Sequence, residues 1–161
     1  MAGKESGGNL LVHGTCVAIP GDNALLKGAL LRGAPGSGKS DLALRFISHF
    51  GGDGTSADGA QLVSDDQVLL IREGDTLLAC APGTIAGKLE VRGMGIVEMD
   101  HHAQAPLAVI VDLVSADEVP RLPCDPLPCE DILGVCVPVL KLNPFEISSP
   151  VKLKMALTGV A

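Results

Sequence analysis

A glycine-rich segment, GAPGSGKSD at residues 33–41, carries the residue types best suited to chemistry. It matches G-x4-G-K-[ST], in which backbone N–H groups point into one concavity and bind phosphate. In this pattern Lys39 reaches the terminal phosphates and the Ser40 hydroxyl is offered to Mg²⁺. The segment therefore predicts a site for nucleotide phosphates, formed by Gly33, Ala34, Pro35, Gly36, Ser37, Gly38, Lys39 and Ser40.

A nucleotide-using enzyme also needs a carboxylate at a strand end, to hold Mg²⁺ or its water. Two places offer one: Asp65 and Asp66 in QLVSDD, and Asp112 in AVIVDL. Adjacent carboxylates repel each other unless a cation or a shared proton compensates, which gives the pair a reason to sit in a site. We favour the pair, one member on the metal side and the other as proton acceptor. Asp112 is interpreted as a strand-end cap or a loop anchor.

Two further stretches are suggestive but weak alone. KLEVRGMGIVEM places Glu90 and Arg92 beside Gly93 and Gly95, a mixture that suits a mobile loop closing over a charged substrate. Taken alone, these residues favour a plain turn with a solvated ion pair. His13, next to a glycine, is by itself more typical of a structural histidine.

These residues need a frame of strands and helices, and the length of 161 residues suits one compact domain. An apolar strand is expected to lead into the glycine segment and an amphipathic helix to follow it. We expect residues 1–9 to be a disordered leader and residues 10–161 to form the domain. The expected elements are a strand within 11–19, a strand within 24–32, a helix over 40–50 ended by Gly51-Gly52, two strands over 61–81 turning at 73–75, an irregular segment 82–99, a buried strand over 106–114, a proline-rich stretch 120–138, a helix over 148–159 capped by Ser149, and a disordered leader 1–9.

Composition excludes several classes of function. A net charge of −7, with no Trp or Tyr, argues against a nucleic-acid track or a base-stacking platform for single strands. No run is long and apolar enough to span a membrane, and the first residues lack a signal core, so a cytosolic protein is expected. Five cysteines without a CxxC pair predict reduced, mostly buried thiols rather than a zinc site: Cys16, Cys80, Cys124, Cys129 and Cys136.

Four stretches in order, LVHGTCVAI, GAPGSGKSDLAL, LVSDDQV and LEVRGMGIV, resemble the catalytic domain of HPr kinase/phosphorylase over about residues 10–157. The resemblance implies an α/β P-loop kinase domain with a mixed sheet, similar to the nucleotide core of phosphoenolpyruvate carboxykinase. It also implies a short form of the family, with the catalytic domain alone. Members phosphorylate a serine of the phosphocarrier HPr with ATP, and many reverse this with inorganic phosphate, releasing pyrophosphate.

The resemblance also assigns roles to residues. His13 matches a histidine near the transferring phosphate, Lys39 the catalytic lysine and Ser40 a Mg²⁺ ligand. The acidic pair supplies the base, for which we favour Asp66, with Asp65 on the metal side. A last match is Glu90 to a Mg²⁺ ligand in the closing loop, which spans Glu90, Val91, Arg92, Gly93, Met94 and Gly95.

The expected partners are ATP, Mg²⁺ and either HPr or its nitrogen-branch paralogue, in a homo-oligomer that the resemblance suggests is a hexamer. One departure concerns the reverse reaction: longer members have an arginine where VCVPVLKLNPF offers Lys141. The GDGTSADGA loop (52–60) is also longer than usual. Two other readings stay open: a kinase acting on a small molecule, and a non-catalytic domain that senses ATP and regulates a partner by contact.

Overall fold

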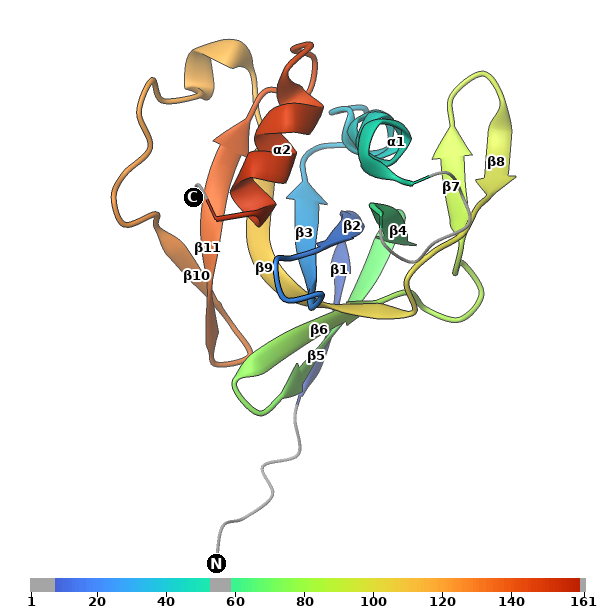
Figure 1. Cartoon of the computed structure of the whole chain (residues 1–161), viewed down its shortest axis with the longest axis horizontal. Coiled ribbons are helices and arrows are strands. Elements are labelled where there is room, and N and C mark those ends of the chain that lie inside the picture. The colour runs from blue at the N-terminus through green and yellow to red at the C-terminus, as the bar shows by residue number, and fades with distance from the viewer. Residues whose placement is uncertain (1–7, 53–58, 160–161) are drawn as a thin grey trace, which may run out of the picture.

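A single mixed sheet with two helices forms the frame of the protein (Figure 1). The computed structural model describes residues 8–52 and 59–159. Seven strands follow the order β1-β5-β6-β9-β3-β2-β4, β11 pairs with β9, and β10 pairs with β11. The strands of this sheet are β1 Asn9–His13, β2 Thr15–Pro20, β3 Leu26–Arg32, β4 Gln61–Ser64, β5 Gln67–Glu73, β6 Thr76–Cys80, β9 Gln104–Leu113, β10 Cys129–Ile132 and β11 Val135–Leu142.

The remaining elements are two helices, a separate hairpin and one short turn of 3₁₀ helix. The hairpin strands pair only with each other in the described part of the chain, and the helices pack together. Their bounds are α1 Lys39–Phe50, α2 Ser149–Leu157, β7 Lys88–Val91, β8 Gly95–Glu98 and the 3₁₀ turn Ala116–Glu118.

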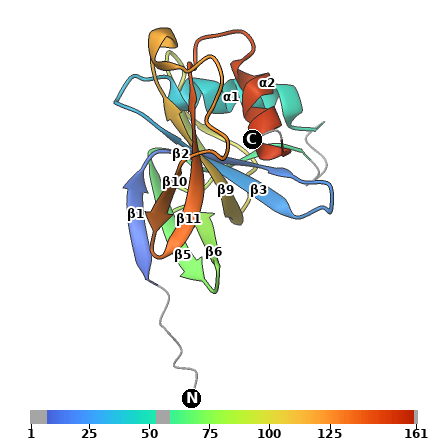
Figure 2. The same cartoon turned by 90° about the vertical axis from the view of Figure 1, so that its left-hand side faces the viewer.

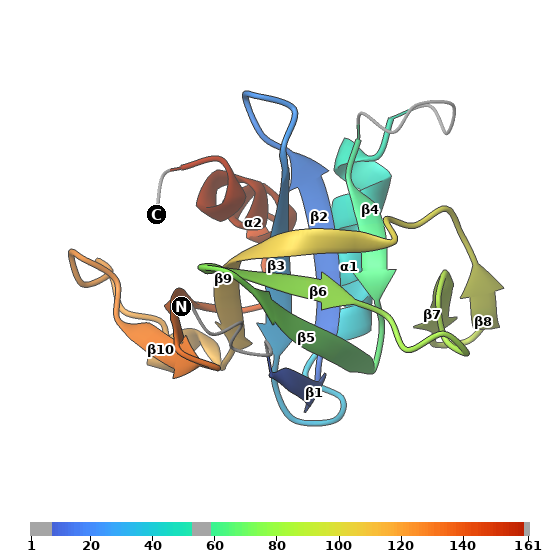
Figure 3. The same cartoon turned by 90° about the horizontal axis from the view of Figure 1, so that it is seen from below.

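The sheet folds back on itself, so its central strands are covered on both faces (Figures 2 and 3). Along β2, Val17 packs with the helices, whereas Cys16 and Ala18 pack with β5 and β6. The long strand β9 joins the two halves, since one end pairs with β6 and the other with β3 and β11. Strands covered on both faces read as continuous apolar runs, which is why Leu, Val, Ile and Ala suffice for this core.

The expected strand–loop–helix unit is confirmed. β3 pairs in parallel with β9, and β9 with β11, so the carboxyl ends of these three strands lie at one edge of the sheet (Figure 1). The glycine loop, residues 33–38, leaves β3 at that edge and enters α1. Leu42 and Phe46 are fully buried, as their helical spacing predicts, and the Gly51 N–H bonds the Ile47 carbonyl where the helix ends.

Two expected strand segments are each divided in the structure. The run 11–19 breaks at Gly14, where a Cβ would lie 2.8 Å from the Leu31 carbonyl oxygen. The chain there leaves its pairing with β5 and joins β3. The expected pair of strands over 61–81 is three, because Asp66 adopts a left-handed backbone (φ 69°) between β4 and β5. The turn at 73–75 is confirmed as the β5–β6 link.

Three other expectations need correction at the level of elements. Residues 82–99 are not irregular throughout, because they contain the β7–β8 hairpin, whose register runs from Lys88–Glu98 to Val91–Gly95. The proline-rich stretch contains β10 and the start of β11. Helix α2 has Ser148 rather than Ser149 at its N-cap, since the Ser149 hydroxyl instead donates to the Asn143 carbonyl.

The ends of the chain and the longer loop are only partly described. Within the expected leader, residues 1–7 lie outside the described residues and Asn9 already begins β1. Most of the 52–60 loop (53–58) lies outside them as well. No helix in the described part of the chain has the length and hydropathy of a membrane-spanning segment.

The prediction of reduced, mostly buried thiols is confirmed only in part: Cys16, Cys80 and Cys124 are free thiols, but one disulfide forms and only Cys16 is fully buried. Cys129 and Cys136 form a disulfide across β10 and β11, because the hairpin brings their Cα atoms to 5.6 Å. Cys124 is exposed and Cys80 half-buried. The fully buried thiol is Cys16, and burial raises its pKa to about 12.

Candidate active site

The glycine loop turns sharply enough to direct its backbone toward the start of α1. Gly36 (φ 79°) and Gly38 (φ 96°) take left-handed conformations that other residues rarely adopt. Gly33 is required for space, since a Cβ there would overlap the Ser37 hydroxyl. A glycine loop that ends in a helix N-terminus presents N–H groups and the positive end of a dipole, which is an arrangement for binding anions.

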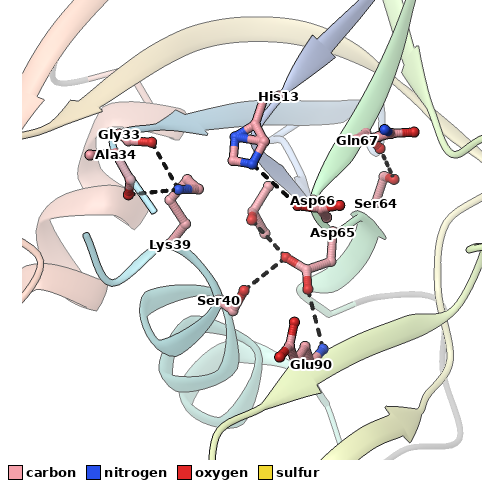
Figure 4. A network of polar contacts seen from close by, with 11 residues as sticks. His13, Gly33, Ala34, Lys39, Ser40, Ser64, Asp65, Asp66, Gln67 and Glu90 are labelled. Carbon is pink, nitrogen blue, oxygen red and sulfur yellow. Dashed lines mark hydrogen bonds and ion pairs between the residues drawn. The ribbon is translucent and has the colours of Figure 1, made fainter. Parts of the chain in front are cut away.

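Lys39, the first residue of α1, is held inside this loop. Its side chain is buried, and its ammonium donates hydrogen bonds to the carbonyls of Gly33 (2.9 Å) and Ala34 (3.0 Å) (Figure 4). These two bonds hold a full positive charge against the concave side of the loop. A phosphate bound in the loop would therefore meet both N–H dipoles and this charge.

Asp65 connects the loop to the other elements of the site (Figure 4). Its side chain is 7% exposed, and one carboxylate oxygen accepts hydrogen bonds from the hydroxyls of Ser40 (2.9 Å) and Thr15 (2.8 Å). Its other oxygen accepts from the backbone N–H of Glu90 at 3.2 Å. One carboxylate thus ties together α1, β2 and β7.

Asp66 lies in a different environment although it is the next residue. Its carboxylate is 73% exposed and sits 3.2 Å from His13 Nε2, at the end of β1 (Figure 4). Its backbone carbonyl accepts a hydrogen bond from the Gly14 N–H at 3.0 Å. This bond joins the bend between β1 and β2 to the bend between β4 and β5. The left-handed backbone at Asp66 directs the two neighbouring side chains to different surroundings: Asp65 is buried among donors and Asp66 is open to solvent.

One pocket, of about 470 Å³, contains most of the predicted residues. Lys39, Ser40, Asp65 and Asp66 line it together with His13, and so do Pro35, Gly36, Gly38, Glu90, Val91 and Arg92. The other residues of the glycine loop are not among those lining the pocket. The carbonyls of Gly33 and Ala34 accept hydrogen bonds from Lys39, and the Ser37 hydroxyl is buried without a hydrogen-bond partner in the described structure. The tip of the β7–β8 hairpin, Gly93, Met94 and Gly95, is exposed beyond the pocket wall.

The alternative carboxylate, Asp112, belongs to a separate ion-pair network. Arg32 donates to both its oxygens, at 2.8 and 3.1 Å, and to Glu130 at 2.5 Å. The hydrogen bond to Asp112 raises the pKa of the Arg32 guanidinium. Asp112 is therefore paired with Arg32, the residue before the glycine loop, so it acts as an anchor at the end of β3 and not as a cap of its own strand.

Four pocket residues were missed by sequence reasoning: Thr15, Asp41, Leu44 and Phe145. Thr15 is fully buried and lies two positions after His13, so a polar residue inside an apolar run was a usable signal. Asp41 and Leu44 follow the glycine loop on the exposed side of α1. Phe145 comes from the β11–α2 connection, and only the pairing of β11 with β9 brings it here.

The oxygen groups in the pocket suit magnesium. Mg²⁺ prefers hard oxygen ligands and is usually held by one or two carboxylates together with substrate phosphates. Ser40 and Asp65 share a hydrogen bond, and Glu90 borders the same pocket. No group of three or more His, Cys, Asp or Glu side chains among residues 8–52 and 59–159 forms a metal site of protein ligands alone. Ser40, Asp65 and Glu90 are oxygen donors of the kind that Mg²⁺ uses together with substrate phosphates.

The sequence of this chain is similar to those of known proteins of one family. A family model described as HPr Serine kinase C-terminal domain matches residues 7–143. HPr kinase/phosphorylase of Verminephrobacter eiseniae is 34% identical over 143 residues, covering 81% of this chain and 40% of that protein. That of Chlorobium chlorochromatii is 33% identical over 142 residues, covering 81% and 38%. The chain thus spans two fifths or less of the length of these relatives.

A solved structure extends the similarity to the fold. The HPr(Ser) kinase/phosphatase from Coxiella burnetii superposes with a TM-score of 0.71 at 25% identity, covering 91% of this chain and 87% of that one. The residues that the family model matches, 7–143, include all the strands, the glycine loop and the acidic pair described above. With the family model covering most of its length, the chain belongs to the HPr Serine kinase C-terminal domain family.

Proposed function

We propose that this chain transfers the γ-phosphoryl group of ATP to a serine of the phosphocarrier HPr or its nitrogen-branch paralogue, and so regulates a phosphotransferase system. The observation that carries the proposal is the Ser40–Asp65 hydrogen bond, at 2.9 Å. It joins a phosphate-binding loop to an acidic pair in one pocket, and the chain belongs to the HPr kinase family. Relatives bear the name HPr kinase/phosphorylase, which supports a protein serine as acceptor.

The glycine loop and Lys39 would bind the β- and γ-phosphates and balance the negative charge of the transferring group. The serine oxygen attacks the γ-phosphorus while the bond to the ADP oxygen breaks. The serine proton passes to the Asp66 carboxylate. Asp66 suits this task because it is open to a protein substrate, and His13 at 3.2 Å orients it.

Asp65, Ser40 and Glu90 are the residues that we expect to hold magnesium. When bound, the metal neutralises charge on the β- and γ-phosphate oxygens. Asp65 is prepared for this role, since the Thr15 hydroxyl and the Glu90 N–H already fix the direction of its carboxylate.

The reverse reaction would use the same loop, with inorganic phosphate attacking the phosphoserine and pyrophosphate leaving. The chain offers Lys141 for the loop arginine of longer members, but Lys141 lies in β11 and is not among the residues lining the pocket. We therefore propose phosphorylation as the principal direction. Pyrophosphate release from a phosphorylated carrier, assayed with and without added phosphate, measures the reverse rate.

The proposal is tested by offering ATP and Mg²⁺ with three acceptors: HPr, the nitrogen-branch carrier, and a panel of small-molecule alcohols. We expect intact-mass spectrometry to find one added phosphate on a carrier, and fragmentation to place it on a serine. Carriers whose acceptor serine is changed to alanine serve as matched controls. Phosphate found only on a small molecule, or on no acceptor while ATP still binds, would refute a protein-serine kinase.

A further inference from the structure

Phe145 holds an aromatic ring on the wall of the pocket, beside the glycine loop. The chain has three Phe and no Trp or Tyr. The other two rings lie in α1, where Phe46 is fully buried and packs edge-on against Phe50, with ring centroids 5.5 Å apart. The side chain of Phe145, by contrast, is 69% exposed. The molecule thus places its one exposed aromatic ring at its phosphate-binding pocket.

The backbone around Phe145 is fixed on both sides. The Asn143 side chain accepts from the Phe145 N–H at 2.8 Å. Arg45, on α1, donates to the carbonyl of Pro144 and, at 3.4 Å, to that of Glu146. These contacts hold the segment against α1 while leaving the ring itself uncovered.

The ring also lies directly against the glycine loop. A Cβ added at Gly38 would come within 3.2 Å of the Phe145 ring and of Pro144, so Gly38 lets the two segments approach closely. A ligand whose phosphates occupy the loop would therefore have an aromatic surface next to it. A phosphate group is polar throughout, so it has no apolar face that could pack against this ring.

The order of the strands says which part of a ligand reaches this ring. Ligands of open α/β sheets bind outside the carboxyl ends of parallel strands, here β3, β9 and β11. The acidic pair follows β4, on one side of the glycine loop, and Phe145 follows β11, on the other. A triphosphate with its γ end at the acidic pair would extend its other end toward β11.

We propose that Phe145 is a stacking platform for the base of a nucleoside triphosphate, an inference that rests on the proposed use of ATP. The base lies flat on the ring, and Phe145 discriminates a nucleotide from bare polyphosphate. Stacking of a base on an aromatic side chain raises affinity by about 5- to 100-fold. Pro35 and Leu44, which line the same pocket, give the base further apolar surroundings.

The test compares Mg-ATP with Mg-tripolyphosphate, which carries the phosphates without a base. Calorimetry on Phe145→Ala should show ATP bound about 5- to 100-fold more weakly and tripolyphosphate bound within about twofold of wild type. Phe145→Tyr, which keeps the ring, should retain ATP affinity. Ile147→Ala is the matched control, because Ile147 is 98% exposed two residues away and is not among the residues lining the pocket.

A second readout uses the absence of tryptophan from the sequence. In Phe145→Trp the single indole reports directly on stacking, so ATP should quench its fluorescence and tripolyphosphate should not. An equal loss of both ligands in Phe145→Ala would overturn the inference, since the ring would then only support the loop. Unchanged ATP affinity would also overturn it while leaving the proposed function intact. A wild-type protein that binds neither ligand would refute the proposed nucleotide site itself.

Discussion

At the residue scale, two neighbouring carboxylates lie in different environments. Asp65 is nearly buried and accepts three hydrogen bonds, whereas Asp66 is open and faces His13. The three donors fix the direction of the Asp65 carboxylate, so its environment suits an oriented ligand beside a metal. That of Asp66 suits a group that must meet an incoming hydroxyl. The division follows from the left-handed backbone at Asp66.

The different surroundings of the two carboxylates predict different defects for the variants Asp66→Asn and Asp65→Asn. Asp66→Asn should still bind Mg-ATP but lose kinase turnover by about 10²- to 10⁴-fold, because the amide cannot accept the serine proton. Asn also tolerates the left-handed backbone, so the fold should survive. Asp65→Asn should raise the Mg²⁺ concentration needed for half-maximal rate. Turnover measured over a Mg²⁺ titration separates the two effects.

The matched control is Asp75→Asn, in the exposed turn between β5 and β6. It should behave as wild type in both measurements. Near-normal turnover in Asp66→Asn, with a collapse in Asp65→Asn, would mean that the roles are exchanged. Normal turnover in both variants would remove the acidic pair from the mechanism.

At the scale of elements, the β10–β11 hairpin carries a disulfide and also contacts the residue that precedes the glycine loop. The disulfide between Cys129 and Cys136 crosses this hairpin, and Glu130, next to Cys129, bonds Arg32 immediately before the glycine loop. Arg32 also clamps Asp112 on β9. The end of β3 is thus fixed by carboxylates on two other strands, β9 beside it and the more distant β10. The β7–β8 hairpin is not part of the main sheet and is tied to it through the hydrogen bond of the Glu90 N–H to Asp65, and its mobility stays a prediction.

The disulfide predicts a particular thiol count. Protein purified without reductant and denatured should react with a thiol reagent at three cysteines, and at five after reduction. In the native protein at pH 8, Cys124 should react first because it is exposed. Cys16 should be protected, since burial raises its pKa to about 12 and leaves almost no thiolate.

A serine variant provides the control for this count. Cys136→Ser frees Cys129, so the unreduced, denatured variant should show four reactive thiols instead of three. Five thiols in the unreduced wild type would mean that the hairpin carries two free cysteines.

At the scale of the whole molecule, the strand–loop–helix unit could be predicted from sequence, and the family resemblance implied the mixed sheet that the structure has, but the order in which the strands pair could not be predicted. An apolar strand, a glycine loop and an amphipathic helix are local patterns, and all three are confirmed. The breaks at Gly14 and Asp66 are invisible to periodicity, because they depend on which distant strand each half pairs with.

The site shows the same limit. Lys39, Ser40 and the acidic pair stand in recognisable patterns, and they meet in one pocket. Phe145 carries no local signal, and only the parallel pairing of β9 with β11 brings it there. The expected hexamer lies beyond a single chain, and it stays a prediction that sedimentation of the purified protein can check.

Phosphoryl transfer through this pocket is the central claim, and a single-turnover reaction tests it most directly. Protein in excess over γ-labelled ATP, mixed with carrier and Mg²⁺, should move the label to a carrier serine. Lys39→Ala should slow this transfer by at least about 100-fold, because a charge that stabilises the transferring group is lost. Lys27→Ala, at the opposite end of β3, should leave the rate unchanged. Equal transfer by wild type and Lys39→Ala would contradict the account.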